Sequence, residues 1–392
     1  MRILLLSHIF PKAIDGGSKV IYKLGQYFES QQHQTLYISS DCSSTDDFVK
    51  KIQHTSPPIN QKIIKLPVYH HLRRPLKFLN LFLKSDFLKV LQKGPIFKII
   101  PFIKTVIKII KFNPDLIVAG PLPTTIVLYG NFFKKITKSK LLINSSFHPT
   151  DFDFQQKPLI KSLQSANFLW TLTQFETDYF IKNFNIDPKK IILAGNGVDS
   201  NFLLKRSKIT TNKPTTNLLF IGSLSAHKRV DLLIQSFSNF ISPKISLTIA
   251  GQKTLFYPQI EKLVNSLDPK IKSQIKFIFD FPQNDLINLI DNCDVLVFPS
   301  IQESFGLVVI ESWARQKPVI CADIPALKEL VTKSNGGLLF KTDDQTDLAK
   351  KIEFIFNHPK KAKELGKNGY EYVKNNYTWK KVGDKICQKI LF

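Results

Sequence analysis

Cysteine, methionine and glycine are scarce in this sequence, which has 4, 1 and 16 of them among 392 residues. The cysteines lie far apart, at Cys42, Cys293, Cys321 and Cys387, and form no C-x-x-C pair. This spacing argues against a metal cluster or a disulfide framework and favours free thiols in a reducing compartment. No apolar run reaches the roughly 18 residues of a membrane-spanning helix, and the run after Met1 is too short for a signal-peptide core. We therefore expect a cytoplasmic protein.

Acidic residues are also few: 31 Asp and Glu stand against 55 Lys and Arg, a formal net charge of +24. The excess is concentrated in residues 51–150, which hold 17 basic and 2 acidic residues, a net +15. A hydrophobic fraction of 43% excludes a disordered chain, and the low glycine content excludes a collagen-like one. So strong a positive charge indicates an anionic partner, which can be nucleic acid, a membrane surface or a phosphorylated ligand.

Short apolar runs alternate with longer mixed segments, and this alternation predicts buried parallel strands connected by helices. The predicted strands of a first series are residues 3–7, 35–39, 116–119, 141–144 and 168–171. Those of a second series are residues 218–222, 246–250, 275–279, 295–299 and 318–322. Helices are expected between them, for example at 19–30 and 101–112. The pattern predicts an α/β protein with two doubly wound, Rossmann-like sheets.

A polar stretch from Ser200 to Asn217 separates the two series, and we place the domain boundary there. At about 100–200 residues per domain, the length of the chain suits two domains. We predict one domain over 1–200 and a second over 201–370. Two tandem doubly wound domains imply a cleft between them, with ligands at the carboxyl ends of the strands in both halves.

A glycine pair, Gly16 and Gly17, follows the first predicted strand and opens a predicted helix. Glycines let the backbone approach a phosphate closely, and the start of a helix supplies free N–H donors. This pair is therefore a candidate phosphate contact. The alternative is an ordinary turn, because the pair is not the G-x-G-x-x-G fingerprint of dinucleotide sites.

The first strand of the second series ends in a comparable loop, in which Gly222 is followed by Lys228 and Arg229. Cations near the start of a helix are unfavourable unless an anion is bound there. A diphosphate that faces Lys228 or Arg229 would resolve this conflict. A solvated charge pair on a surface turn is the alternative.

Two carboxylates follow the predicted strand that ends at Pro299. Glu303 lies in a loop with Gly306, and Glu311 lies eight positions beyond Glu303 in a predicted helix. Carboxylates accept hydrogen bonds from sugar hydroxyls, so the pair is able to hold two parts of one polyhydroxylated ligand. Because residues 307–310 are apolar, we expect Glu311 to lie deep in the structure, where an unpaired charge is costly.

The stretch from Val297 to Glu311 resembles the E-x7-E signature of the GT4-type retaining glycosyltransferases with a GT-B fold, the glycosyltransferase group 1 family. Four more segments resemble this family, in the family's order along the chain: Asn113–Ile117, Ala166–Glu176, Gly195–Asp199 and Tyr377–Trp379. The resemblance implies two Rossmann-like domains that face a central cleft, with a C-terminal helix, 371–392, that returns to the first domain. It also implies a nucleotide-sugar donor, a UDP- or GDP-sugar, and transfer with retention of anomeric configuration.

The resemblance implies roles for the residues of the E-x7-E segment. Glu311 would hold the ribose hydroxyls of the donor nucleotide. Glu303, with the backbone of Ser304, Phe305 and Gly306, would orient the transferred sugar. The family mechanism is a front-face attack without an obligatory protein nucleophile, so we assign none.

Other matching positions imply contacts with the reacting groups. Lys228 matches the family lysine that neutralises the donor diphosphate, and Gly16 and Gly17 match an N-terminal glycine pair whose amides face the same phosphates. His148 follows the predicted strand 141–144 and resembles the family histidine near the reacting centre. A capped turn at His148 is the alternative.

Two positions depart from the family pattern. Ser223 stands directly after Gly222, where the family often has an arginine, and Arg229 is the candidate substitute for the missing cation. Asn167 replaces the usual aspartate of the A-D pair, which we interpret as a structural change. We expect no metal cofactor, since no D-x-D sequence lies in a loop predicted to reach the site and Lys228 can supply the positive charge.

The basic block contains two segments that mix cations with large apolar side chains. In residues 70–84 the membrane or acceptor candidates are Arg73, Arg74, Lys77, Phe78, Phe82 and Lys84. A helix with cations on one face and Phe or Leu on the other favours contact with an anionic membrane surface. Residues 101–112 place Lys104, Lys108 and Lys111 on one face, and a helix with a solvated basic face is the alternative there.

These observations together predict a cytoplasmic glycosyltransferase, peripheral on the inner face of a membrane, that moves a hexose-type sugar to a lipid-linked or polysaccharide acceptor. Charge alone supports a nucleic-acid-binding protein, but no recognised nucleic-acid-binding motif is present and we expect no such partner. A nucleotide-sugar epimerase of the same fold is disfavoured by Glu303 and Glu311. Ser223 leaves open a non-catalytic binder of sugar nucleotides.

Overall fold

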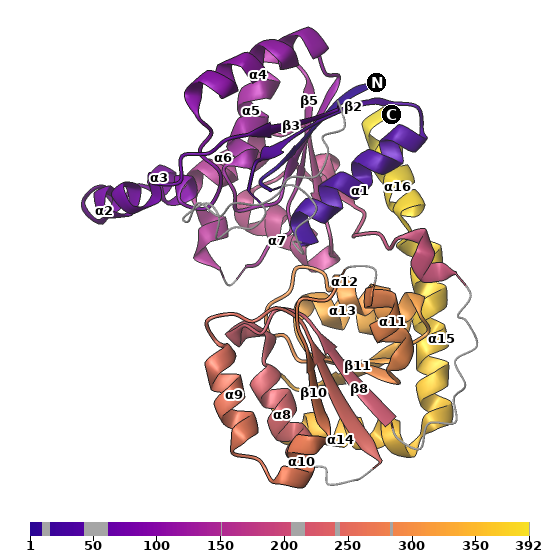
Figure 1. Ribbon diagram of the computed structural model, residues 1–392. Helices are drawn as coiled ribbons and strands as arrows, with labels where there is room; N and C mark the ends of the chain where they lie inside the picture. The colour runs from indigo at the N-terminus through magenta and orange to yellow at the C-terminus, as the bar shows by residue number, and fades with distance from the viewer. Residues whose placement is uncertain are drawn as a thin grey trace. The chain divides into compact units, whose positions relative to one another are not determined.

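The computed structural model describes residues 1–9, 16–42, 62–149, 151–204, 216–239, 244–282 and 285–391. These residues form two compact units. Unit 1 consists of Met1–Asn196 and Trp379–Phe392, and unit 2 of Gly197–Thr378. Each unit contains a parallel sheet covered by helices (Figure 1), which confirms the predicted α/β class with two doubly wound sheets. Residues 205–215 of the predicted polar linker lie outside the described residues.

Unit 1 carries the first series of strands and the helices between them. The strands are β1 (Arg2–Ser7), β2 (Gln34–Ser40), β3 (Ile63–Leu66), β4 (Leu116–Gly120), β5 (Lys140–Asn144), β6 (Phe168–Thr171) and β7 (Ile191–Leu193). The helices are α1 (Gly16–Ser30), α2 (Arg73–Leu83), α3 (Asp86–Leu91), α4 (Ile99–Phe112), α5 (Ile126–Thr137), α6 (Lys157–Ser165), α7 (Gln174–Phe184) and α16 (Trp379–Leu391), with short 3₁₀ turns η2 (Phe152–Gln155) and η3 (Pro188–Lys190).

Unit 2 carries the second series. Its strands are β8 (Thr216–Ile221), β9 (Ile245–Ala250), β10 (Ile275–Ile278), β11 (Val295–Phe298), β12 (Val319–Ala322) and β13 (Gly337–Phe340). Its helices are α8 (Val230–Ser238), α9 (Tyr257–Asn265), α10 (Pro269–Ser273), α11 (Asp285–Asn292), α12 (Leu307–Ala314), α13 (Pro325–Ser334), α14 (Gln345–Asn357) and α15 (Pro359–Asn376), with 3₁₀ turns η4 (Ser200–Leu203) and η5 (Ala226–Lys228).

Both sheets are wound in two directions from a central pair of strands. The order is β3-β2-β1-β4-β5-β6-β7 in unit 1 and β10-β9-β8-β11-β12-β13 in unit 2, with every pair parallel. The winding direction reverses between β1 and β4 in the first sheet and between β8 and β11 in the second. In an open α/β sheet, ligands bind at the carboxyl ends of the strands where the order reverses. The topology therefore marks one candidate ligand position in each unit.

All ten strands and both helices named from the sequence are present, and the strands that sequence reasoning missed are at sheet edges. β3 and β7 form the two edges of the first sheet, and β13 forms one edge of the second. Their side chains are mostly half-buried, whereas β4 and β11 are buried throughout. A central parallel strand is covered on both faces and is recognisable as a continuous apolar run, while an edge strand carries a weaker pattern, which was nevertheless sufficient to predict the edge strand β10.

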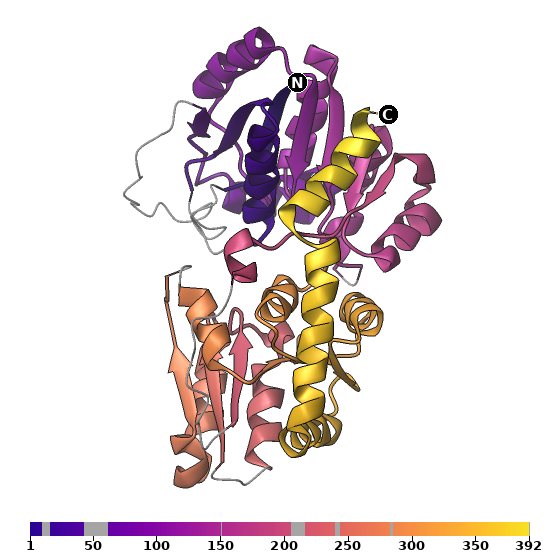
Figure 2. The same cartoon turned by 90° about the vertical axis from the view of Figure 1, so that its right-hand side faces the viewer.

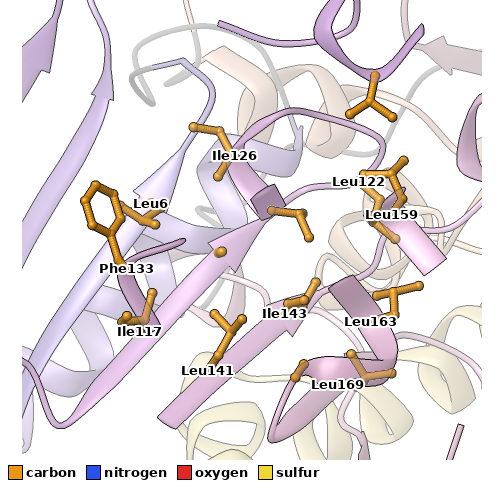
Figure 3. Close-up of a cluster of buried hydrophobic side chains, with 14 of the residues drawn as sticks. Leu6, Ile117, Leu122, Ile126, Phe133, Leu141, Ile143, Leu159, Leu163 and Leu169 are labelled. Atoms are coloured by element: carbon orange, nitrogen blue, oxygen red, sulfur yellow. The ribbon is translucent and has the colours of Figure 1, made fainter. Parts of the chain in front are cut away.

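One large hydrophobic core cluster of unit 1 lies between the sheet and the helices packed on one of its faces. Figure 3 shows Ile117, Leu141, Ile143 and Leu169 of the strands with helix residues such as Phe133. All of these side chains are at most 1% exposed. Burial of one Leu, Ile or Phe side chain contributes about 1.5–3 kcal/mol, so this packing holds the carboxyl ends of the strands in fixed positions.

The C-terminal helix α16 packs on helix α1 within unit 1, as the resemblance implied (Figure 2). Gly383 makes the close approach possible, because a Cβ atom at this position would collide with the ring of Tyr27. The Tyr27 hydroxyl donates to Asp384 Oδ1 at 2.7 Å, and Trp379 meets Trp170 edge-to-face at 6.5 Å between ring centroids. The last residues of the chain are thus part of the first unit, although the whole second unit precedes them in sequence.

Candidate functional site

In unit 2 the predicted donor residues gather where the strand order reverses. The loop after β8 carries Lys228, and the loop after β11 carries Glu303. The Lys228 ammonium forms an ion pair with Glu303 Oε1, and both side chains are more than four-fifths buried. Lys228 Nζ also lies 5.1 Å from the centre of the Phe298 ring at the end of β11. The structure brings together two residues that are 75 positions apart and were each singled out from the sequence.

Backbone hydrogen bonds join the two loops and fix this pair. The amide of Ile301 donates to the carbonyl of His227 at 2.9 Å, and the Ser300 hydroxyl donates to the same carbonyl at 3.4 Å. Burial and the neighbouring Lys228 charge lower the pKa of His227, while Glu303 opposes this shift. Because its pKa is lowered, the His227 imidazole is neutral near pH 7 and adds no charge to the loop. The positive charge of the loop after β8 therefore resides on Lys228 and Arg229.

Gly222 and Gly251 let the loops after β8 and β9 approach one another. A Cβ atom on Gly251 would overlap the backbone of Gly222, so only glycine fits at position 251. The amide of Gly222 donates to the carbonyl of Ala250 at 3.0 Å, and that of Leu224 donates to Gln252 at 2.9 Å. The small-residue turn predicted at Gly222 is present, and it lies on the same edge of the sheet as Lys228.

Arg229 and Ser223 are placed differently from Lys228. Arg229 forms ion pairs with Asp343 and, at 3.4 Å, with Asp231, so its guanidinium already has two carboxylate partners. It also precedes α8 in a left-handed conformation, with φ of 50°. The Ser223 hydroxyl lies 3.2 Å from that of Ser225. In this arrangement the cation closest to Glu303 is supplied by Lys228.

The E-x7-E segment forms a loop and the first turns of α12. Gly306 has a φ of 94° and precedes the helix, and a Cβ atom there would lie 2.8 Å from Leu327 Cδ2. Phe305 is buried with its ring 5.2 Å from that of Tyr377, so only its backbone is available to a ligand. Ser304 is half-buried, and Glu311 is buried in α12, as its sequence position predicted.

In unit 1 the glycine pair lies beside the reversal between β1 and β4. Gly16 begins α1, and a Cβ atom on Gly17 would lie 2.5 Å from Pro121, which follows β4. Buried polar side chains meet there: Ser18 Oγ lies 2.8 Å from Ser7 Oγ and 3.2 Å from His8 Nδ1. The start of α1 is therefore held against the carboxyl ends of the two central strands. The loop 10–15 that precedes it lies outside the described residues.

His148 lies in the turn after β5, and a buried carboxylate holds that turn. The His148 ring packs edge-to-face on Phe154 at 5.3 Å between centroids. Glu176 Oε1 accepts from the amide of Phe147 at 2.8 Å, and Oε2 accepts from that of Leu172 at 2.5 Å. Sequence reasoning assigned no role to Glu176, although the T-x-x-E pattern that begins with Thr173 is a helix-capping signal. Thr173 does cap α7, accepting from the amide of Glu176 at 3.2 Å.

Complete burial raises the pKa of Glu176 from 4.5 to about 7, against the hydrogen bonds that favour its charged form. At pH values between about 4.5 and about 7, the folded protein therefore keeps a proton on Glu176 that the unfolded chain releases. The free energy of unfolding consequently falls as the pH rises through this range. At about 1.4 kcal/mol per unit, the loss is on the order of 3 kcal/mol. We expect Glu176→Gln to remove this loss, measured as the variant-minus-parent difference in urea unfolding at pH 5 and 7.5. An equal pH dependence in the two proteins would contradict the assignment.

The structure also contains a buried charged cluster that sequence reasoning missed. Arg315, after α12, donates to both carboxylate oxygens of Asp291 in α11, at 2.8 and 2.7 Å. Lys317 donates to the carbonyls of Asp291 and Cys293. All three charged side chains are at most 8% exposed. Arg315 and Asp291 are 24 positions apart in sequence, and nothing in the sequence indicates that they are in contact.

Among the described residues no group of three or more His, Cys, Asp or Glu side chains could hold a metal ion. The D-x-D sequence of unit 1, Asp151-Phe152-Asp153, has structural partners: Asp151 accepts from the amide of Asp153 at 2.9 Å, and Asp153 pairs with Lys93. Within the described ranges, no helix has both the length and the apolar character needed to cross a membrane.

The membrane candidates of the basic block lie on α2, which projects from the rest of unit 1 in Figure 1. Phe78 and Phe82 are 64% and 70% exposed and meet edge-to-face at 5.1 Å. Arg74, Lys77 and Lys84 are exposed as well, and the side chain of Arg73 lies outside the described set. The apolar side chains of this helix are therefore not used in the core.

Comparison with known proteins adds to this geometry. The model of the family described as glycosyl transferases group 1 matches residues 201–372, almost all of unit 2. An uncharacterized glycosyltransferase of Methanocaldococcus jannaschii is 29% identical over 239 residues, 57% of this chain and 65% of that protein. The O-antigen chain mannosyltransferase of Salmonella typhimurium is 29% identical over 199 residues, 50% of this chain and 53% of that protein. The chain spans between half and two thirds of the length of these curated relatives.

Solved structures resemble the whole chain. The structure of Anabaena HepE in complex with UDP has a TM-score of 0.75 at 16% identity and covers 100% of both chains. That of WaaG, a glycosyltransferase involved in lipopolysaccharide biosynthesis, has a TM-score of 0.67 at 15% identity and covers 99% of both chains. At such identities the likeness establishes the fold, and it confirms the predicted GT-B class.

Proposed function

We propose that this chain, residues 201–372 of which match the model of the glycosyl transferases group 1 family, moves a hexose-type sugar from a nucleotide-diphosphate sugar to a lipid-linked or polysaccharide acceptor with retention of anomeric configuration. The observation that carries the proposal is the Lys228–Glu303 pair at the strand-order reversal of unit 2. A cation and a carboxylate that are mutually paired and mostly buried suit a ligand with both phosphates and hydroxyls. UDP in the complex of Anabaena HepE supports a nucleotide donor.

The chemistry of the pair follows from charge. Cleavage of a sugar–diphosphate bond develops negative charge on the leaving phosphate, and a preorganised cation lowers the barrier by several kcal/mol. We propose that Lys228 leaves Glu303 for the diphosphate when the donor binds. The Glu303 carboxylate then accepts hydrogen bonds from the hydroxyls of the sugar. His148 in unit 1 is the candidate side chain near the reacting centre, and the helix start at Gly16 and Gly17 is the candidate second contact with the phosphates.

Buried Glu311 gives the proposal its first test. If it accepts from the ribose hydroxyls, Glu311→Gln should weaken donor binding about 10–100-fold, the effect of a hydrogen bond to a charged group. The measurement is the thermal shift of the full chain against UDP- and GDP-sugar concentration, because a ligand stabilises in proportion to the logarithm of its concentration. Glu364→Gln, an exposed acid of unit 2, is the matched control. Equal shifts for parent and Glu311→Gln would contradict the ribose contact.

The same panel separates the alternative functions. Release of UDP or GDP from a bound donor supports a transferase, whereas binding without release supports a non-catalytic sugar-nucleotide binder, the alternative raised by Ser223. Conversion of the donor into a sugar nucleotide with one inverted stereocentre supports an epimerase. Absence of any thermal shift with all donors would overturn the donor site itself.

The acceptor part of the proposal rests on α2. An amphipathic helix with exposed Phe78 and Phe82 beside Arg74 and Lys77 is typical of elements that lie in an anionic membrane interface. A lipid-linked acceptor is presented at such a surface. We therefore propose that the chain works as a peripheral protein on the cytoplasmic face of a membrane and takes an acceptor carried by lipid.

A further inference from the structure

Helix α4 has three distinct sides. At about 100° per residue, Thr105 and Ile109 share one side, which is buried against unit 1. Phe102 on the same side packs against the rings of Tyr129 and Phe133, at 5.3 and 5.8 Å between centroids. These contacts fix the rotation of the helix about its axis. The other two sides are consequently turned away from the core.

The second side is an exposed isoleucine strip. It spans about 100° of the helix circumference and runs the length of the helix. Its members and their exposed fractions are Ile99 61%, Ile100 70%, Ile103 53%, Ile107 49% and Ile110 51%. Helix α4 uses only one of its sides in the core, so these isoleucines are left exposed. Large contiguous apolar patches on a protein surface mark sites that another apolar surface covers.

The third side is a lysine strip directly beside the isoleucines. Lys104, Lys108 and Lys111 are all exposed, and no acidic residue occurs between positions 87 and 114. The long stems of lysine can lie along apolar matter while the ammonium groups reach outward. Isoleucine and lysine strips therefore face outward side by side, the pattern of a helix that lies in a membrane interface.

We propose that the isoleucine strip of α4 inserts into the surface of an anionic lipid bilayer while its lysine strip contacts the lipid phosphates. The proposal rests on the membrane part of the proposed function and gives unit 1 a second insertion element beside α2. Two separate insertion elements on one compact unit would fix the orientation of that unit on the bilayer. The carboxyl end of its sheet is then held at a set angle to a lipid-borne acceptor.

Charge favours a bilayer over other partners for this surface. A second copy of the chain would place two lysine strips opposite one another, and like charges in contact are destabilising. Nucleic acid would pair with the lysines but would leave five isoleucines in water. An anionic lipid bilayer binds both strips. The lysines are attracted to the negatively charged surface, and the inserted isoleucine side chains are removed from water.

The test is co-sedimentation of the full chain with vesicles. We compare vesicles of phosphatidylglycerol and phosphatidylethanolamine with vesicles of phosphatidylcholine, at low and high salt. The variant Ile100→Gln/Ile103→Gln/Ile107→Gln should lower the partition coefficient for anionic vesicles at least about tenfold. The matched control is Ile136→Gln/Leu193→Gln/Leu391→Gln, three exposed apolar residues of the same unit outside α4, which should bind as the parent does.

Further arms make each outcome decisive. Vesicle binding and its salt dependence should be lost in the variant Lys104→Gln/Lys108→Gln/Lys111→Gln. The control variant Lys135→Gln/Lys182→Gln/Lys189→Gln has the same change in charge and should lose less of its vesicle binding. Ile103→Trp should shift its fluorescence to the blue only with vesicles; Trp170 and Trp313 are fully buried, and the signal of the half-buried Trp379 is removed by subtracting the parent spectrum. Circular dichroism and the unfolding midpoint establish that the variants are folded.

Three results would overturn the proposal. Parent-like binding of the triple isoleucine variant would do so, as would an unshifted Ile103→Trp spectrum. A parent dimer that becomes monomeric in the isoleucine variant, with vesicle binding retained, would assign the strip to a second copy instead. Phe78→Gln/Phe82→Gln tests α2 separately: if this variant binds as the parent does and the α4 variant does not, only the α2 part of the proposed function fails. None of these readouts depends on sugar transfer.

Discussion

The variant Lys228→Ala is expected to release UDP or GDP from the donor about 10²–10³-fold more slowly than the parent chain. Lys228 is the cation paired with Glu303 at the strand-order reversal of unit 2, and its ammonium is mostly buried. Removal of one preorganised group that faces developing charge costs about 2.7–4 kcal/mol of barrier. Arg229 is not placed to compensate, because Asp231 and Asp343 hold its guanidinium.

The companion variants decide whether the loss is chemical. Glu303→Ala should also lose turnover, since it removes the acceptor for the sugar hydroxyls and leaves Lys228 without its carboxylate. Lys328→Ala, which removes an exposed cation paired with Asp323 at 3.1 Å in the same unit, should keep parental turnover. Nucleotide release is followed by coupled assay or chromatography, with the unfolding midpoint as the check on folding. Parental turnover in both Lys228→Ala and Glu303→Ala would show the site assignment to be wrong.

The sheets could be predicted from the sequence because their central strands are buried on both faces. Runs such as Leu116–Gly120 and Val295–Phe298 have no polar alternation, and the intervening segments are long enough for crossover helices. The edge strands β3, β7 and β13 could not be predicted from the sequence. One side of each has no neighbouring strand, and their half-buried residues form a weaker hydrophobic pattern. The same physics that makes a strand central makes it recognisable.

Lys228 and Glu303 could each be singled out from the sequence, but their ion pair could not. Lys228 and Glu303 each stood out as a charge in a small-residue loop after a strand. Only the adjacency of β8 and β11, which the sequence does not state, brings the two loops together. Once it does, the contact between Ile301 and the His227 carbonyl fixes their separation.

In helix α4, the sequence does not predict which of the apolar side chains are buried. Its lysine stripe was visible in the sequence, and its isoleucines were equally compatible with a buried face. The rotation of the helix against the sheet, set by Phe102 and Ile109, decides which apolar residues are buried. Hydrophobic periodicity predicts that a helix has an apolar side. A helix with more apolar residues than fit against its neighbours leaves the remaining ones exposed.

The Arg315–Asp291 cluster couples the start of unit 2 to its helices. Arg315 Nη1 donates to the carbonyls of Phe202 and Leu204, at 2.9 and 2.6 Å, while the other guanidinium nitrogens hold Asp291. One buried side chain thus joins η4, α11 and the end of α12. The hydrogen bonds from Arg315 to the carbonyls of Phe202 and Leu204 hold the segment next to the predicted linker in place.

Removing one partner of this pair is expected to have the largest effect on stability. Asp291→Ala leaves a buried guanidinium without its carboxylate, which costs about 3–5 kcal/mol of the free energy of unfolding. For a unit of this size that is roughly 6–20 °C in the unfolding midpoint. The double variant Asp291→Leu/Arg315→Met removes both charges and should recover part of the loss. Recovery is incomplete because the carbonyls of Phe202 and Leu204 then lack their donor.

Urea unfolding and amide hydrogen exchange distinguish this cluster from ordinary surface charge. Glu364→Ala breaks the exposed pair with Lys361, 2.7 Å apart, and should cost at most about 1 kcal/mol. In Asp291→Ala the amides of η4 and α11 should exchange faster than those of β8. If Asp291→Ala cost no more than Glu364→Ala, the buried pair would not be what holds this segment. If it destabilised every amide of unit 2 equally, the cluster would be part of the global core rather than a local fastening.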